Sequence, residues 1–128
     1  MIEQITKGIK ISIETEFEGT FYEDDCIHYA FSYEVVIENQ SNDVAQLIAR
    51  KWNIMEALNE NETIIGEGVV GEKPILIPGD RHTYSSGCVL KSPFGAMNGS
   101  YLMVNPTNSK QFKVTIPTFK LSASFAQN

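Results

Sequence analysis

The chain has 128 residues, of which 42% are apolar and 20% are charged, and its formal net charge is −6. This length is typical of one domain and provides a core that needs no disulfide or metal for stability, so we expect a single domain over residues 1–128. The apolar content excludes an intrinsically disordered chain.

The charge is divided unevenly along the sequence. Residues 1–64 contain 4 basic and 13 acidic side chains, a balance of −9, whereas residues 65–128 contain 6 basic and 3 acidic side chains, a balance of +3. Lys and Arg form no dense cluster of the kind that neutralises phosphates. We therefore expect no nucleic-acid partner.

The sequence also indicates the compartment. No apolar run is long enough for a signal peptide or a membrane span, so we expect no membrane association. Cys26 and Cys88 form no C-x-x-C pair, and two free thiols in a reducing cytoplasm are the simplest interpretation.

Apolar and polar residues alternate with a period of two through most of the chain. The alternation predicts half-buried strands at residues 9–18 and 28–39. A third strand is expected at residues 45–55, although polar residues, Arg50 among them, interrupt its apolar face. We attribute this interruption to burial of both faces of the strand. A helix over residues 44–52 is the alternative there.

The rest of the chain consists of short extended segments between turns. A polar turn at residues 59–62 leads into the short apolar segment ETII, and Pro78-Gly79 marks another turn. Pro117 lies inside the last extended segment and should place that strand at an edge, a break or a bulge. We expect an all-β sandwich of seven to eight strands, with its later strands at residues 81–90, 100–104 and 111–125.

The sequence GEGVVG at residues 66–71 has the G-x-G-x-x-G spacing of a phosphate-binding turn. Such a turn binds pyrophosphate because the N–H groups of a following helix point at the anion. Here Pro74 and Pro78 exclude that helix, and Glu67 and Glu72 would repel a phosphate. We interpret the motif as a connection between the two sheets that uses positive φ or close packing. Nucleotide or pyrophosphate binding stays open as an alternative, with Gly66, Gly68, Gly71, Lys73 and Arg81 as its residues.

Residue types of a nucleophilic site gather within nine positions, at Asp80, His82, Ser85, Ser86 and Cys88. On a strand that rises about 3.3 Å per residue, His82 and Cys88 would stand roughly 20 Å apart, too far for a hydrogen bond. We therefore expect no catalytic site and no enzymatic activity, and nothing in the sequence calls for a cofactor.

Acidic residues gather in the N-terminal half, at Glu14, Glu16, Glu18, Asp24 and Asp25. Their oxygens are suitable ligands for a hard cation such as Mg²⁺, so divalent-cation binding is a second alternative. Because no EF-hand spacing is present, a solvated acidic face is the favoured interpretation.

Arg50 and Trp52 form a candidate recognition patch, since Trp and Arg are enriched at binding hot spots. The competing interpretation is that Trp52 is the core tryptophan of a sandwich strand.

Several segments, in this order, resemble the ApaG family: ITKGIKISIET, YAFSYEVVIENQS, QLIARKWNI, GEGVVGEKPILIPGD, YSSGC, GAMNGSY and IPTFKL. The resemblance runs from about Ile5 to Leu121, and its most specific parts are GEGVVGEKP, the PGD-to-YSSG stretch and G-x-M-x-G-x-Y. Two departures stand out, because Lys51 replaces a histidine that many members have and Cys88 replaces a common threonine.

The resemblance implies a stand-alone bacterial member with a fibronectin type III-like or Ig-like sandwich. Similar domains occur in some F-box proteins and in a polymerase-δ-interacting protein, which implies a protein-recognition module. Bacterial members are linked in name to cobalt and magnesium efflux. We therefore expect a cytoplasmic, non-enzymatic module that binds an unknown protein partner and is itself a monomer or weak homodimer.

Overall fold

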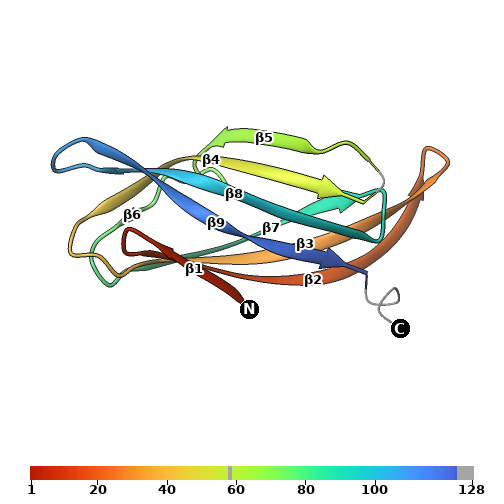
Figure 1. The fold of residues 1–128 in the computed structure, drawn as a ribbon, viewed down its shortest axis with the longest axis horizontal. Helices are drawn as coiled ribbons and strands as arrows, with labels where there is room; N and C mark the ends of the chain where they lie inside the picture. Colours follow the sequence, from red (N-terminus) through yellow and green to blue (C-terminus); the bar gives the residue numbers. More distant parts are fainter. Residues whose placement is uncertain (58, 124–128) are drawn as a thin grey trace.

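The computed structural model describes residues 1–57 and 59–123, which form strands joined by turns and loops (Figure 1). Within this part of the chain, the strands are β1 (Ile2–Thr6), β2 (Ile9–Glu23), β3 (Cys26–Asn39), β4 (Ala45–Glu56), β5 (Glu62–Glu67), β6 (Ile75–Leu76), β7 (Arg81–Leu90), β8 (Phe94–Asn105) and β9 (Lys110–Ser122). Residues 124 and 125 of the last predicted strand lie outside the described residues.

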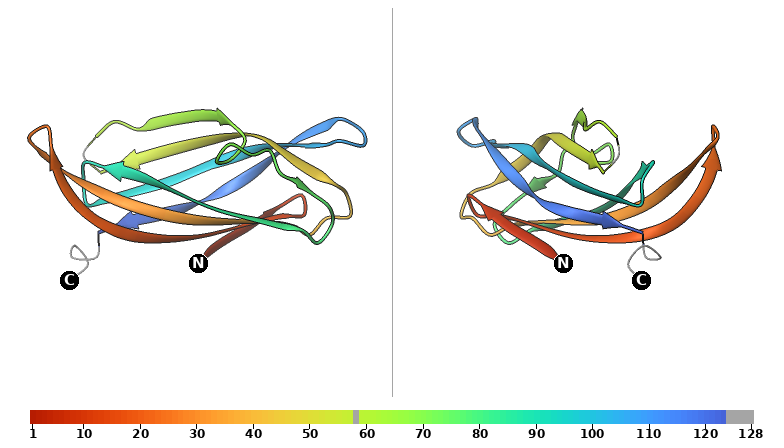
Figure 2. Two further views of the ribbon diagram at one scale, coloured as in Figure 1. Left: turned by 180° about the vertical axis from the view of Figure 1, so that it is seen from behind. Right: turned by 45° about the vertical axis from the view of Figure 1, so that its right-hand side comes forward.

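The strands form two antiparallel sheets that face each other as a sandwich (Figures 1 and 2). One sheet has the order β1-β2-β3-β7, and the other has the order β5-β4-β8-β9, with β6 also paired to β4. The predicted all-β sandwich is confirmed, and residues 45–52 of the alternative helix lie in β4. The prediction assigned no strand to the two-residue β6 or to β1, whose residues are mostly exposed and give no clear alternation.

The core fills the space between the inner faces of the sheets. Ile9, Ile11 and Ile13 of β2 are fully buried or nearly so, as the alternation predicts. Aromatic rings occupy the centre, where Trp52 packs against Tyr33 with ring centroids 5.3 Å apart. In the part of the chain that the structure describes, no helix is long and apolar enough to cross a membrane.

The two long edges of the sandwich differ. At one edge β1 and β2 contact β9, so the sheets close against each other. The register of β9 on β8 shifts between Met97 and Gly99, opposite Pro117, so the predicted edge position and bulge at this proline are both confirmed. At the other edge β5 and β7 are the outermost strands of their sheets, and a cavity separates them.

A β-bulge in β4 determines which residues face the core. The register of β4 on β8 shifts between Leu47 and Ala49, so Ile48 is the extra residue. Before the bulge Leu47 is buried, and after it the buried positions are Trp52 and Ile54. The bulge places the polar Gln46 on the outer face, whereas Arg50 stays on the inner face with Trp52 and Ile54 and lines the cavity. The two faces are not both buried, because Lys51 on the outer face is exposed.

Candidate functional site

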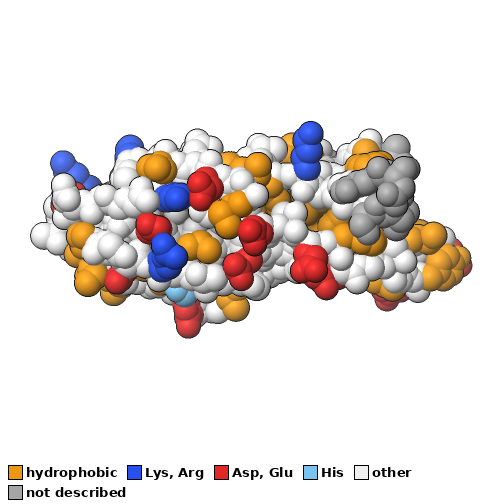
Figure 3. All heavy atoms as spheres, turned by 90° about the horizontal axis from the view of Figure 1, so that it is seen from below, with side chains coloured by type: hydrophobic (Ala, Val, Ile, Leu, Met, Phe, Trp, Pro, Cys, Tyr) orange, Lys and Arg blue, Asp and Glu red, His pale blue; other side chains and the backbone are white. Residues whose placement is uncertain are grey.

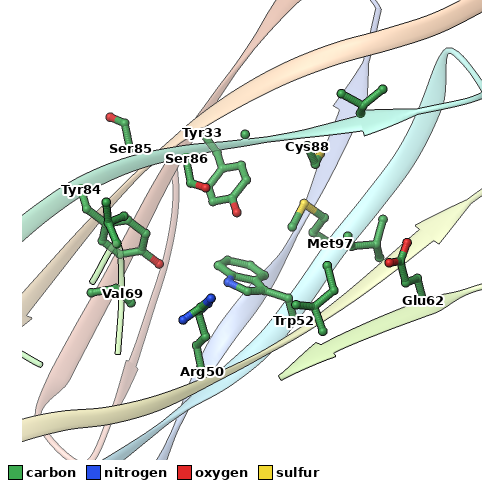
Figure 4. A pocket seen from close by; sticks show the side chains of 15 residues that line it. Tyr33, Arg50, Trp52, Glu62, Val69, Tyr84, Ser85, Ser86, Cys88 and Met97 are labelled. Carbon is green, nitrogen blue, oxygen red and sulfur yellow. The ribbon is translucent and has the colours of Figure 1, made fainter. Parts of the chain in front are cut away.

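A cavity of about 540 Å³ opens between β5 and β7 (Figure 4). Buried aromatic residues, Tyr33 of β3 and Trp52 of β4, form its floor. Ile64 of β5 and Val89 of β7 are partly exposed at its walls, and Arg50 lies at one end. The cavity therefore combines an apolar floor with a single strongly basic side chain.

The sequence of β7 keeps this edge open. Every second side chain of β7 faces the other sheet, at Tyr84, Ser86 and Cys88. Their pairing partners on the neighbouring strand β3 are Val35, Tyr33 and Phe31. Tyr84 is buried, but Ser86 is exposed and Cys88 only partly buried. Because Ser86 is too small to span the space between the sheets, the sandwich remains open at its position.

Two tyrosines, Tyr33 and Tyr84, line the inner part of the cavity. Burial raises the pKa of Tyr33, and the neighbouring Ser86 side chain and the Arg50 charge act in the opposite direction. Burial also raises the pKa of Tyr84, whose hydroxyl is hydrogen-bonded to that of Tyr101. These phenols therefore remain neutral hydrogen-bonding groups over the ordinary pH range.

Arg50 is held in place by the end of β5 and the loop after it. Its Nη1 donates hydrogen bonds to the carbonyl oxygens of Glu67, at 2.7 Å, and Gly68, at 2.9 Å. Gly66 lies directly opposite Arg50 in the β4–β5 ladder, and a Cβ atom there would stand 2.7 Å from Nη2 of Arg50. Gly66 therefore leaves the space in which the guanidinium sits.

The other two glycines shape the loop itself. Gly68 and Gly71 have φ values of 60° and 76°, a region that disfavours residues with a side chain. The expected use of positive φ is confirmed at these two positions. The expectation that the motif connects the two sheets is wrong, because it joins β5 to β6, which both pair with β4.

Three of the loop N–H groups are already bonded within the protein. Gly68 N donates to Ile48 O at 2.8 Å, while Val69 and Glu72 exchange two backbone hydrogen bonds of 2.8 and 3.0 Å. A phosphate at this turn would have to displace these bonds.

The two basic residues suggested for an anion site have other partners. Lys73 pairs with Glu67 at 3.5 Å, and Arg81 pairs with Glu38 at 3.0 Å. The structure therefore combines Gly66 and Gly68 with Arg50 and leaves Lys73 and Arg81 in separate ion pairs.

The residues of the nucleophilic pattern, from Asp80 to Cys88, do not form a triad. His82 and Cys88 lie six positions apart on β7, and Nε2 of His82 is 3.7 Å from a carboxylate oxygen of Glu72. Burial raises the pKa of Cys88 to about 11, so its thiol is protonated at neutral pH and is a poor nucleophile.

The acidic residues of the N-terminal half are spread along the β2–β3 hairpin. Glu14 and Glu16 lie midway along β2, whereas Asp24 and Asp25 form the turn at its far end, with φ values of 52° and 61°. The hydroxyl of Ser32 donates to Glu18 at 2.7 Å. Among the described residues, no three His, Cys, Asp or Glu side chains are placed to hold a metal ion.

The outer face of the β1-β2-β3-β7 sheet has an interspersed distribution of charge. Figure 3 shows red and blue side chains scattered along it, with hydrophobic side chains gathered at the hairpin end. Phe21, Tyr22 and Ile27 are the exposed apolar residues of that hairpin.

The candidate recognition pair is divided between core and cavity. Trp52 is only 4% exposed and packs edge-on against Phe119, as expected of a core tryptophan. Arg50 and Trp52 nevertheless both line the cavity. Tyr33 and Ser86 complete the site. The sequence placed Ser86 only in the nucleophilic pattern and gave no signal for Tyr33, because only the pairing of β3 with β7 brings the two together.

Comparison with known proteins places the chain in a family. The model of the ApaG domain matches residues 20–105. The Protein ApaG of Anaeromyxobacter dehalogenans is 40% identical over 121 residues, which cover 94% of each chain. That of Acidithiobacillus ferrooxidans is 39% identical over 124 residues, which cover 97% of each.

Solved structures agree. An X-ray structure of a structural-genomics target is 34% identical with a TM-score of 0.86, covering 91% of this chain and 87% of that one. A crystal structure of a Bordetella pertussis protein named as ApaA is 34% identical with a TM-score of 0.83, covering 90% of this chain and 93% of that one. The chain therefore belongs to the ApaG family.

Proposed function

We propose that this chain is a non-enzymatic protein-interaction module that binds an extended segment of a partner protein along the outer edge of β7. The observation that supports this proposal best is the open cavity between β5 and β7, because it lies beside a strand edge that pairs with no other strand in the described residues.

An unpaired strand edge and an adjacent apolar cavity are the two parts of strand-addition recognition. The edge provides backbone N–H and C=O groups for the ladder, and the cavity accepts alternate side chains of the added strand. The stretch from Tyr84 to Val89 lines the cavity. At about 3.3 Å per residue, a partner segment of five or six residues would span it.

Two features support a binding role over a catalytic one. The Cys88 thiol is held protonated by burial, and among the described residues His82 contacts Glu72 and no nucleophile. The link of ApaG proteins to cobalt and magnesium efflux would then be indirect and would depend on the partner. We place this function in the cytoplasm and assign it to a monomer or weak homodimer.

Selection from a library of random peptides on the immobilised chain tests the proposal. Peptides that bind should slow amide hydrogen exchange in β7 more than in any other strand. Ser86→Trp fills the opening and should abolish their binding, whereas Lys113→Trp adds the same ring to the exposed surface of β9 and should not. Failure to select any peptide, or binding that leaves β7 exchange unchanged, would contradict the proposal.

A further inference from the structure

Arg50 is a partly buried cation without a carboxylate partner. In the described part of the chain, the basic side chains in ion pairs are Lys10, Lys73, Arg81 and His82. Arg50 is in none of these pairs, and within the described residues its guanidinium donates only to two neutral carbonyl oxygens. A cation on the inner face of a sheet is costly unless an anion compensates it.

The guanidinium is fixed in one orientation. Both hydrogen bonds from Nη1 go to consecutive carbonyl groups, and Nη2 lies over Gly66. Nη2 and Nε therefore retain N–H groups that have no acceptor within the described residues. A planar guanidinium held in this way is suited to bidentate binding of a carboxylate.

Two further donors line the same end of the cavity. Figure 4 shows the indole nitrogen of Trp52 on the side of the ring facing Arg50, and the Tyr33 hydroxyl directed into the cavity. In the described residues, every side-chain nitrogen or oxygen that is shielded from solvent has a hydrogen-bond partner. The indole N–H has no partner among these residues, so it is not shielded from solvent. The indole N–H is therefore accessible from the cavity. Guanidinium, indole and phenol together form a donor-rich site beside the Ser86 hydroxyl.

The opposite end of the cavity has the opposite charge. Glu62 lies opposite Ile54, and Gly66 lies opposite Arg50, so the acidic and basic ends are four strand positions apart. This separation is about 13 Å. A carboxylate is therefore attracted to the Arg50 end and repelled from the Glu62 end.

We propose that the Arg50 end of the cavity binds the carboxylate of an Asp or Glu side chain in a segment paired with β7. The ligand is an internal side chain and not a C-terminus, because the β7 edge continues in both directions past the cavity, from Arg81 to Leu90. This inference rests on the proposed function, since it names the partner residue that the module recognises.

The test uses the blocked peptides acetyl-KTVTXTVTK-amide, with X as Glu, Gln or Ala, in calorimetric titrations. The Glu peptide should bind at least tenfold more tightly than the Gln peptide. Tyr33→Phe, which keeps the ring and removes the donor, should weaken the Glu peptide severalfold. Arg50→Gln should remove the preference for Glu and leave the affinity for the Gln peptide within about twofold.

Trp52 supplies an independent readout, because the chain has a single tryptophan and its indole N–H gives one assignable NMR resonance. The Glu peptide should move this resonance downfield, and the Gln peptide should move it much less. Equal binding of the Glu and Gln peptides with β7 still protected would refute the carboxylate inference alone. Absence of binding by all three would count against the proposed function as well. Tighter binding of acetyl-KTVTV with a free C-terminus would overturn the assignment to a side chain.

Discussion

Replacing Gly66 by alanine should destabilise the protein only when Arg50 is present. The added Cβ would stand 2.7 Å from Nη2 and 2.8 Å from Cζ of Arg50, so the guanidinium must move. It would then lose its hydrogen bonds to Glu67 O and Gly68 O. In the absence of the arginine, the three atoms nearest to the added methyl group are gone.

The magnitude follows from these two bonds. Hydrogen bonds from a charged donor are worth about 1.5–3 kcal/mol each when buried, and partial exposure reduces this to about 1 kcal/mol each here. Alanine in a strand gains about 0.5–1 kcal/mol over glycine. Gly66→Ala should therefore cost about 1–1.5 kcal/mol in the wild type and stabilise the Arg50→Ala background by about 0.5–1 kcal/mol, a coupling near 2 kcal/mol.

Urea unfolding of the four proteins in this cycle, followed by the fluorescence of the buried Trp52, measures the coupling. Gly68→Ala is the matched control. It introduces a side chain at a φ of 60°, against the carbonyl of Glu72, and should be destabilising in both backgrounds. Additive effects of Gly66→Ala and Arg50→Ala would refute the conclusion that Gly66 makes room for the guanidinium.

Three further predictions concern other buried groups. Asn39→Ala removes a fully buried amide that donates to two backbone carbonyl oxygens, and should cost about 2–4 kcal/mol in urea unfolding; a loss below about 1 kcal/mol would contradict this. Tyr101→Phe leaves the buried Tyr84 hydroxyl unpaired and should lower the free energy of unfolding by about 1–2 kcal/mol. Replacing both tyrosines by Phe should recover part of that loss, and additive costs would be inconsistent with a paired interaction. Burial raises the pKa of Cys88 to about 11, so iodoacetamide at pH 8 should alkylate it about 200-fold more slowly than a thiol of pKa about 8.5. Mass spectrometry measures the two alkylation rates, and equal rates would exclude the protonated state.

The architecture could be predicted from the sequence because the signals for strands and edges are local. Alternation along residues 9–18 and 28–39 marks the buried faces of β2 and β3, and the apolar positions follow the prediction, although Ser12 on the polar face of β2 is also buried. Pro117 lacks an N–H group, and this chemistry alone predicts its edge position and bulge.

The bulge at Ile48 could not be predicted, because an extra residue is recognised only when the partner strand is known. An unbroken alternation from Leu47 would place Lys51 inside and Arg50 outside. The structure has the reverse arrangement, with Arg50 at the cavity and Lys51 exposed. Likewise, Tyr33 and Ser86 are 53 positions apart and become neighbours only through strand pairing. The candidate site is therefore a product of register, which the sequence pattern does not specify.

The bulge and the glycine motif serve the same side chain. The bulge at Ile48 turns Arg50 toward the space between the sheets, and the same Ile48 carbonyl accepts the N–H of Gly68. Gly66 leaves room for the guanidinium, and the carbonyl groups of the following residues fix it. The spacing of the first two glycines thus follows from the strand pairing, in which position 66 faces Arg50 and position 68 begins the turn. The motif presents an anion-binding arginine through its carbonyl groups, whereas a nucleotide-binding turn presents its own N–H groups.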